Sequence, residues 1–77
     1  MFLHLGKSTV IVAEDVVGIF DIETTTVSSR TRQFLADAEK NGKVINVSTE
    51  LPKSFVILKN GFVYISRLSP QTLEARL

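Results

Sequence analysis

The fold of this chain is decided by the stretch Ser54-Phe55-Val56-Ile57-Leu58-Lys59-Asn60-Gly61-Phe62-Val63-Tyr64-Ile65-Ser66-Arg67. Two runs of β-branched and aromatic residues flank Asn60-Gly61, a dipeptide typical of the two-residue turn of a β-hairpin. Such a turn needs positive φ at both central residues, which asparagine and glycine tolerate best. A two-residue loop also sets the register, which is expected to pair Leu58 with Val63, Val56 with Ile65, and Ser54 with Arg67.

This register gives the hairpin two faces, because side chains alternate along a strand. One face is the expected core and carries Val56, Leu58, Val63 and Ile65. The other face carries Phe55, Ile57, Lys59, Phe62, Tyr64 and Ser66. A hairpin on the surface of a soluble monomer usually has a polar outer face. Since this one is apolar, either a helix of the same chain or another chain must cover it. The candidate oligomer interface is therefore Phe55, Ile57, Phe62 and Tyr64.

The composition predicts one small domain over residues 1–77. A chain of this length buries only about 60% of its unfolded surface, so association between subunits would add to its stability. The sequence has no cysteine, which excludes disulfides and cysteine-ligated metals. It shows no apolar run long enough for a membrane span and no basic leader, so the expected location is cytoplasmic.

The residues before the hairpin predict three strands and one main helix. Strands are expected over residues 2–5, 9–13 and 16–22, with a bulge or close contact at Gly18. A helix is expected over residues 28–40, with Ser28 or Ser29 as its N-cap and Gly42 after its C-terminal end. Its apolar stripe is expected to be Val27, Thr31, Phe34, Leu35 and Ala38.

The rest of the chain completes an α+β fold. A short strand is expected over residues 43–47 and a polar loop over 48–50. A helix over residues 71–77 is expected after Ser69 as N-cap and Pro70 at the first helical position. So short a helix needs a surface to dock on, either the sheet or a neighbouring subunit. The predicted architecture has five to six mostly antiparallel strands, one main helix and a short C-terminal helix.

The polar residues give little support to an enzyme. Asp21 and Glu23 would point the same way on a strand, but a metal site needs more oxygen ligands than these two carboxylates. His4 has no serine or aspartate partner marked in the sequence, and no glycine-rich phosphate loop is present. We therefore expect no catalytic residue, no metal, no cofactor and no small-molecule ligand.

The charges leave nucleic acid as an open possibility. The net charge of +1 divides into −3 over residues 1–24 and +4 over residues 25–77. The tentative DNA-binding residues are Arg30 and Arg32 at the start of the main helix, Lys53 before the hairpin, and Arg67 on it. One subunit would neutralise few phosphates, whereas a ring or filament repeats the same contacts. The hairpin aromatic residues can stack on bases, although an apolar protein interface uses the same residue types.

Several short motifs, in order along nearly the whole chain, resemble the Rem family of bacterial regulators of extracellular matrix genes, and especially its RemB branch. They are His4-Leu5-Gly6, Asp15-Val16-Val17-Gly18-Ile19-Phe20-Asp21, Phe34-Leu35, Pro52-Lys53-Ser54, Tyr64-Ile65-Ser66, Leu68-Ser69 and Thr72-Leu73. The resemblance implies a small α+β regulator that assembles into rings. In the RemA branch such assemblies bind DNA through arginines before the third strand and before the hairpin. Here Asp15 stands at the first position and Glu50, Leu51 and Pro52 at the second, so that Lys53 alone matches a basic position.

Two functions follow as hypotheses. The first is a homo-oligomeric, ring-forming regulator of extracellular matrix or biofilm genes, which binds double-stranded DNA directly or acts beside a DNA-binding relative. The second is a non-catalytic scaffold or adaptor that acts through protein contacts alone. The acidic first third of the chain favours the second hypothesis, because it would repel phosphates.

Overall fold

A computed structural model describes residues 1–6, 8–47 and 50–77. Its elements in chain order are β1 (Phe2–His4), β2 (Val10–Val12), a 3₁₀ turn η1 (Ala13–Asp15), β3 (Val16–Asp21), α1 (Ile22–Thr25), α2 (Ser29–Lys40), β4 (Val44–Asn46), β5 (Ser54–Leu58), β6 (Val63–Ser66) and α3 (Pro70–Ala75). One sheet pairs β1 with β2, and the other has the strand order β3-β5-β6-β4. Among these strands, the pairing of β4 with β6 is parallel and the others are antiparallel. The predicted α+β class is confirmed.

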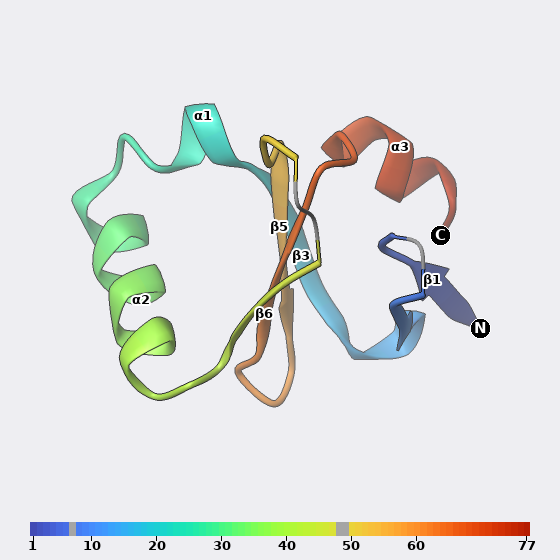
Figure 1. Ribbon diagram of the computed structural model, residues 1–77, viewed down its shortest axis with the longest axis horizontal. Helices are drawn as coiled ribbons and strands as arrows, with labels where there is room; N and C mark the ends of the chain where they lie inside the picture. Colours follow the sequence, from blue (N-terminus) through green and yellow to red (C-terminus); the bar gives the residue numbers. More distant parts are fainter. Residues whose placement is uncertain (7, 48–49) are drawn as a thin grey trace.

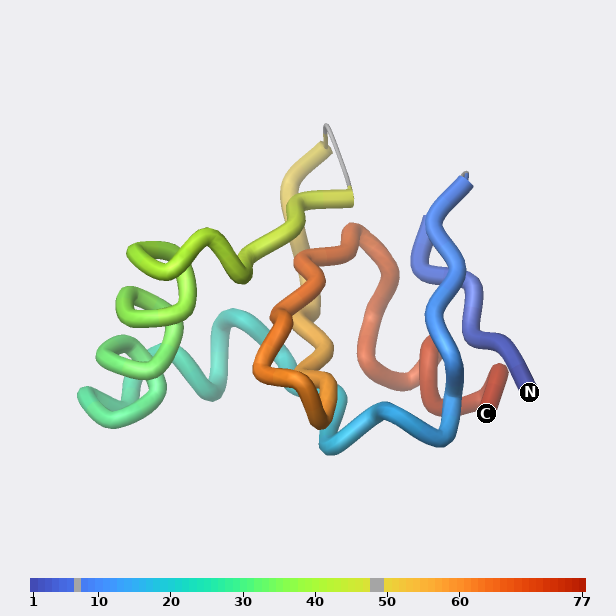
Figure 2. Tube along the Cα trace, turned by 90° about the horizontal axis from the view of Figure 1, so that it is seen from below, coloured from blue at the N-terminus to red at the C-terminus, as the bar shows by residue number. Residues whose placement is uncertain are grey.

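The four-stranded sheet is the middle layer of the molecule. Figure 1 shows α2 on one side of this sheet, and β1, β2 and α3 on the other. The tube in Figure 2 gives the same arrangement from below. Both faces of the β5–β6 hairpin are therefore covered within the chain, by a helix on one side and by the N-terminal hairpin with α3 on the other.

The turn of the central hairpin differs from the expected one. Gly61 has φ of +87°, whereas Asn60 has a negative φ, so the type I′ turn is wrong. The Gly61 amide donates to the Leu58 carbonyl at 2.9 Å, and the Leu58 amide donates to the Phe62 carbonyl at 2.9 Å. This is a three-residue loop, in which a turn is followed by a left-handed glycine. Asn60 contributes through its side chain, because its Oδ1 accepts from the Phe62 amide at 3.0 Å.

The longer loop shifts the register by one residue. As a result, each side chain of β6 faces the side of the sheet opposite to the expected one. The observed pairs are Ser54 with Ser66, Phe55 with Ile65, Val56 with Tyr64, and Ile57 with Val63. The expected register is therefore wrong, and so is the expected single core face of Val56, Leu58, Val63 and Ile65. These four residues divide between two apolar clusters on opposite sides of the sheet.

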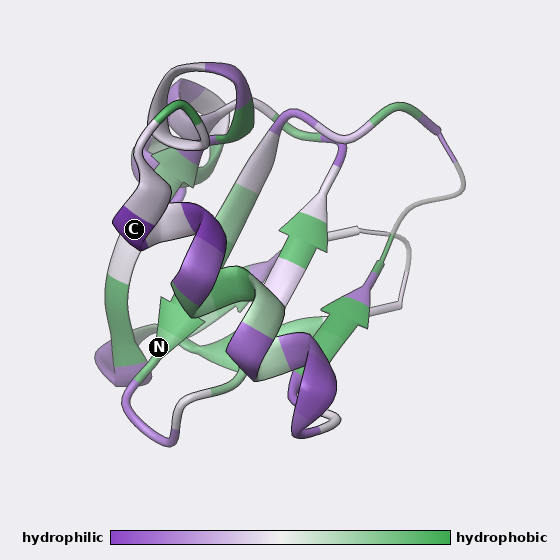
Figure 3. Cartoon of the chain, turned by 90° about the vertical axis from the view of Figure 1, so that its left-hand side faces the viewer, coloured by the Kyte–Doolittle hydropathy of each residue, from purple (hydrophilic) through white to green (hydrophobic). Residues whose placement is uncertain are grey.

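The cluster on the α2 side is built around Phe55, Val63 and Ala38. The Phe55 ring stacks on the Phe20 ring with their centroids 5.2 Å apart, a separation typical of favourable aromatic pairs. Figure 3, which faces this side of the molecule, shows predominantly hydrophobic strands behind α2. Of the predicted stripe on α2, only Ala38 is buried, while Phe34 remains 41% exposed.

The cluster on the other side joins β1, β2 and α3 to the sheet, and its buried members are Leu3, Leu5, Ile11, Val56, Leu58 and Leu73. Two fully buried serines reinforce this contact. The Ser66 hydroxyl donates to the Leu5 carbonyl at 2.8 Å and accepts from the Leu68 amide at 3.1 Å. The Ser54 hydroxyl donates to the Leu68 carbonyl at 2.7 Å. The N-terminal strands are thus held to the sheet by packing and by hydrogen bonds.

Local signals placed most helix ends correctly. Ser69 caps α3, since its hydroxyl accepts from the Thr72 amide at 3.1 Å, and Pro70 opens the helix as expected. Ser28 is the N-cap residue of α2 by its extended backbone, but its side chain makes no capping hydrogen bond. Gly42 follows α2 with φ of +71°, as expected.

The third strand was expected one residue too long, and the short helix after it was missed. Asp21 ends β3 and caps α1, because its Oδ1 accepts from the amides of Glu23 at 2.8 Å and Thr24 at 3.2 Å. The expected irregularity at Gly18 is confirmed by a register shift between Val16 and Gly18. A Cβ atom at Gly18 would lie 2.5 Å from the Phe20 ring, so any larger residue would force that ring to shift. Ser48 and Thr49 of the expected polar loop lie outside the described residues.

Candidate interaction surfaces

The cations Lys53 and Arg67 lie next to each other at one end of the sheet. Lys53 precedes β5 and Arg67 follows β6, and the Lys53 amide donates to the Ser66 carbonyl at 2.9 Å. Both side chains are exposed. The hairpin therefore brings together two of the four tentative DNA-binding residues.

Carboxylates surround this pair. Arg67 Nε lies 3.9 Å from Glu50 Oε2 in an exposed ion pair, a geometry that contributes little stability. Lys53 lines a depression of about 230 Å³ together with Asp21 and Glu23. Three acidic side chains thus accompany two cations at this end of the sheet, and they oppose the attraction of a phosphate.

Asp21 and Glu23 do not form the paired carboxylates that an alternating strand would present. The strand ends at Asp21, whose carboxylate accepts the first amides of α1, and Glu23 belongs to that helix. Within residues 1–6, 8–47 and 50–77, no three histidine, cysteine, aspartate or glutamate side chains are grouped so that they could hold a metal ion.

Arg30 and Arg32 lie on the first turn of α2 but point to different surroundings. The Arg32 Nη1 donates to the carbonyls of Thr26 and Val27, both at 2.9 Å, and so holds the loop between α1 and α2. Arg30 lines a pocket between α2 and the sheet. Lys53 and Arg67 are therefore adjacent, whereas Arg30 and Arg32 face different surroundings, so the four tentative DNA-binding residues do not form one patch.

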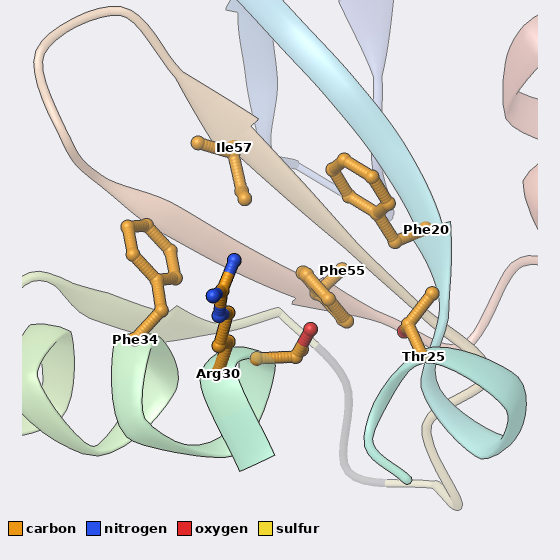
Figure 4. Close-up of a pocket in the computed structure, with 7 residues that line it drawn as sticks. Phe20, Thr25, Arg30, Phe34, Phe55 and Ile57 are labelled. Carbon is orange, nitrogen blue, oxygen red and sulfur yellow. The ribbon is translucent and has the colours of Figure 1, made fainter. Parts of the chain in front are cut away.

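The pocket beside Arg30, called here the α2 pocket, has a volume of about 250 Å³ and is mostly apolar. Its lining comes from β3, α1, α2 and β5, and consists of Phe20, Thr25, Arg30, Thr31, Phe34, Phe55 and Ile57. Figure 4 shows the Arg30 guanidinium extending between Phe34 and Phe55. Among the described residues that line this pocket, Arg30 alone carries a charge.

The four predicted interface residues do not share a face. Phe55 and Ile57 belong to the α2 side of the sheet, where both line the α2 pocket. Phe62 and Tyr64 pack against the cluster on the other side. Phe55 is only 2% exposed, and the other three are half-buried. The expected interface is thus divided by the sheet itself.

The N-terminal hairpin presents an apolar surface that was not predicted from the sequence. In β1 and β2, Leu3 and Ile11 point into the core, and the residues that flank them point outward. We call this outward surface the outer hairpin face; Phe2 pairs with Val12 on it, and His4 with Val10. Phe2 is 65% exposed, Val10 44% and Val12 41%. The alternation of side chains along these two strands could have predicted this surface. It places one set of apolar side chains in the core and leaves a second set exposed.

Acidic residues follow the outer hairpin face directly, in the turn η1. The N-terminal ammonium group of Met1 donates to Glu14 Oε2 at 3.1 Å. This hydrogen bond is the main reason why the pKa of the Glu14 carboxyl lies below its ordinary value. The positive charge of Lys59 lowers the pKa further, but only weakly. The Asp15 carbonyl accepts from the Lys59 amide at 2.9 Å, which ties η1 to the central hairpin.

The described residues thus present two apolar surfaces, the outer hairpin face and the α2 pocket, and one pair of adjacent exposed cations, Lys53 and Arg67. Among the helices in the part of the chain that the structure describes, none combines the length and apolar content that crossing a membrane requires.

Residues 2–77 match the family model described as RemA-like, extracellular matrix regulatory protein A-like. The chain therefore belongs to the RemA-like family of extracellular matrix regulatory proteins. It is similar to extracellular matrix regulatory protein B of Bacillus subtilis (strain 168), with 36% identity over 76 residues. That alignment covers 99% of this chain and 89% of that protein. The expected resemblance to the Rem family and its RemB branch is confirmed, and with it a place among regulatory proteins.

Proposed function

We propose that this protein is a homo-oligomeric regulator of extracellular matrix or biofilm genes, which assembles into a ring and contacts double-stranded DNA through cations repeated around it. Membership of a family of matrix regulatory proteins supports the regulatory part of the proposal. The ring and the DNA contact rest on the surfaces of the chain itself.

The observation that carries the proposal is the exposed outer hairpin face. Phe2 of β1 is 65% exposed and shares the outer hairpin face with the exposed Val10 and Val12 of β2. A contiguous exposed apolar surface of this kind is typical of a protein–protein contact. Covering one large apolar side chain contributes about 1.5–3 kcal/mol. For a domain of 77 residues with a small core, that contribution is a substantial part of its stability.

The DNA part of the proposal depends on repetition. Lys53 and Arg67 are adjacent, exposed and at the end of the sheet, and one protomer would contribute only these few contacts. Each phosphate contact contributes about 0.9 to the slope of log affinity against log salt. A ring multiplies that contribution by the number of protomers that touch the same duplex.

An adaptor without nucleic acid is the second candidate function. The observation that favours it is the set of carboxylates on Asp21, Glu23 and Glu50 around the same two cations. These acids lower the local positive potential that a phosphate would meet.

Fluorescence anisotropy with labelled promoter DNA, repeated at rising salt, separates the two functions. We expect salt-dependent binding that is weakened by Lys53→Glu together with Arg67→Glu, and a slope that falls by about 0.9 for each phosphate that these two side chains neutralise. Lys40→Glu together with Lys59→Glu is the matched control, since both side chains are exposed and lie at the end of α2 and after β5, and the substitutions likewise replace two cations by acids.

Two outcomes would contradict parts of the proposal. Binding that is absent at low salt, while light scattering finds an oligomer, would favour the adaptor. Equal effects of the Lys40–Lys59 variant and the Lys53–Arg67 variant would remove Lys53 and Arg67 from the DNA contact.

A further inference from the structure

The two adjacent cations of the proposed DNA contact are not equally available to a phosphate. Lys53 and Arg67 lie at the end of the sheet where β3 leads into α1 and β6 leads toward α3 (Figure 1). Arg67 already faces a carboxylate, because its Nε lies 3.9 Å from Glu50 Oε2. Within residues 1–6, 8–47 and 50–77, no carboxylate lies at ion-pair distance from Lys53.

We propose that the contact between Glu50 and Arg67 is autoinhibitory: Glu50 occupies Arg67 in the free protein and thereby lowers the affinity for DNA. This inference rests on the proposed function, because it takes a phosphate as the competing partner of Arg67. A carboxylate and a phosphate both accept hydrogen bonds from the same guanidinium. A phosphate that binds Arg67 must therefore displace Glu50 first.

The contact has the properties of one that a phosphate can displace. The Arg67 and Glu50 side chains are 47% and 72% exposed, and their separation of 3.9 Å is longer than a charge-assisted hydrogen bond. Arginine and phosphate frequently pair through two parallel hydrogen bonds. Each phosphate that the protein neutralises also releases counterions from the duplex. DNA is thus a stronger competitor for Arg67 than one exposed carboxylate.

The other two acids at this end of the sheet have different surroundings. The Asp21 carboxylate accepts from the amides of Glu23 and Thr24, and is held in place by α1. Glu23 lines the depression that Lys53 also lines, without an ion pair between them among the described residues. In the part of the chain that the structure describes, Glu50 is therefore the acid that pairs with a proposed DNA-binding side chain.

The expected effect of removing the acid follows from the strength of exposed ion pairs. Glu50→Gln keeps the size of the side chain and removes its charge. Breaking one exposed ion pair shifts an equilibrium by about two- to fivefold, so Glu50→Gln should tighten DNA binding by about that factor for each protomer in contact with the duplex. In a ring, the gain grows with the number of protomers that touch the same duplex.

Fluorescence anisotropy with labelled promoter DNA at constant low salt tests the inference, with Glu39→Gln as the matched control. This control is the same substitution, with the same change of net charge, at an exposed residue in the last turn of α2. That helix ends near the hairpin turn, since Lys43 Nζ donates to the Asn60 carbonyl at 3.3 Å (Figure 1). The control therefore lies at the opposite end of the sheet, and the gain of Glu50→Gln over Glu39→Gln measures the local effect.

A double-mutant cycle shows whether Glu50 acts through Arg67. In the Arg67→Gln background, Glu50→Gln should bind no more tightly than Glu39→Gln does, because no guanidinium is left to release. A gain of the same size in that background would overturn the autoinhibitory contact. Thermal melting checks that the variants fold, which is expected because the ion pair is exposed and contributes little stability.

The outcomes separate this inference from the proposed function. If the wild type binds DNA and Glu50→Gln behaves like Glu39→Gln, the inference is wrong and the proposed DNA contact stands. If the wild type does not bind at low salt but Glu50→Gln does, the inference is supported, because the acid alone then prevents binding. If neither the wild type nor Glu50→Gln binds at low salt, both the inference and the proposed DNA contact are overturned.

Discussion

Replacing Ser66 by alanine should destabilise this protein by more than the loss of one buried side chain, because the Ser66 hydroxyl makes two hydrogen bonds. Ser66 is fully buried, and its hydroxyl both donates to the Leu5 carbonyl and accepts from the Leu68 amide. The substitution removes two hydrogen bonds at about 1 kcal/mol each, with a further penalty for leaving a buried group without its partner. We expect the free energy of unfolding to fall by about 2–3 kcal/mol.

The opposite serine in the sheet is a matched control for this prediction. Ser54 pairs with Ser66 across β5 and β6 and is also fully buried, and its hydroxyl donates a single hydrogen bond, to the Leu68 carbonyl. Ser54→Ala should therefore cost only about 1 kcal/mol. Urea unfolding of both variants measures the difference, provided that the slope against denaturant is unchanged.

The same two variants also test whether Ser66 holds the N-terminal hairpin in place. Because Leu5 follows β1, the Ser66 variant should speed hydrogen exchange at the amides of β1 and β2 more than at those of α2. If Ser66→Ala and Ser54→Ala cost the same, or if the β1 amides are unaffected, then Ser66 does not secure β1 through its two hydrogen bonds.

Three further predictions concern a helix, a pair of arginines and one carboxylate. Leu73→Ala leaves a cavity where a side chain is 0% exposed, and should lower the free energy of unfolding by about 2–5 kcal/mol in a urea titration; a decrease below about 1 kcal/mol would contradict the packing of α3. Arg32→Gln should lower the melting temperature, because Arg32 Nη1 donates to two loop carbonyls, whereas Arg30→Gln should lower it less, because Arg30 lines the α2 pocket and holds neither carbonyl; a larger effect of Arg30→Gln would contradict this difference. The pKa of Glu14 is lowered in the folded state, so its stabilising effect is present above its ordinary value of 4.5 and disappears as the pH falls through the lowered value. The melting temperatures of the wild type and Glu14→Gln should therefore converge in acid, and a gap that is constant with pH would refute this.

The hairpin illustrates how close a sequence prediction can come and still misplace side chains. Asn60-Gly61 correctly located the turn, since both candidate loops centre on these residues. The choice between them depended on a distant contact, because the Lys59 amide donates to the Asp15 carbonyl at 2.9 Å. With that amide engaged, Lys59 joins the loop, and a shift of one residue moves every side chain of β6 to the other face.

The candidate surfaces were likewise predictable from the sequence only in part. The adjacency of Lys53 and Arg67 was predictable, because residues flanking a hairpin end together whichever loop joins its strands. Their acidic neighbours were not, since Asp21 reaches them only through the pairing of β3 with β5, where Asp21 lies opposite Ser54. The α2 pocket draws on four elements, so no local pattern could have predicted it.

The sequence by itself determined the features that depend on neighbouring residues. These are the positions of the strands, the capping of α3 by Ser69, the end of α2 before Gly42, the bulge at Gly18 and the motifs of the family. Each of the structural features is set by backbone preferences and hydrogen bonds within a few residues. Only the tertiary structure decided the hairpin register, the covering of both sheet faces and the outward position of Phe2, because these depend on contacts between segments far apart in the chain.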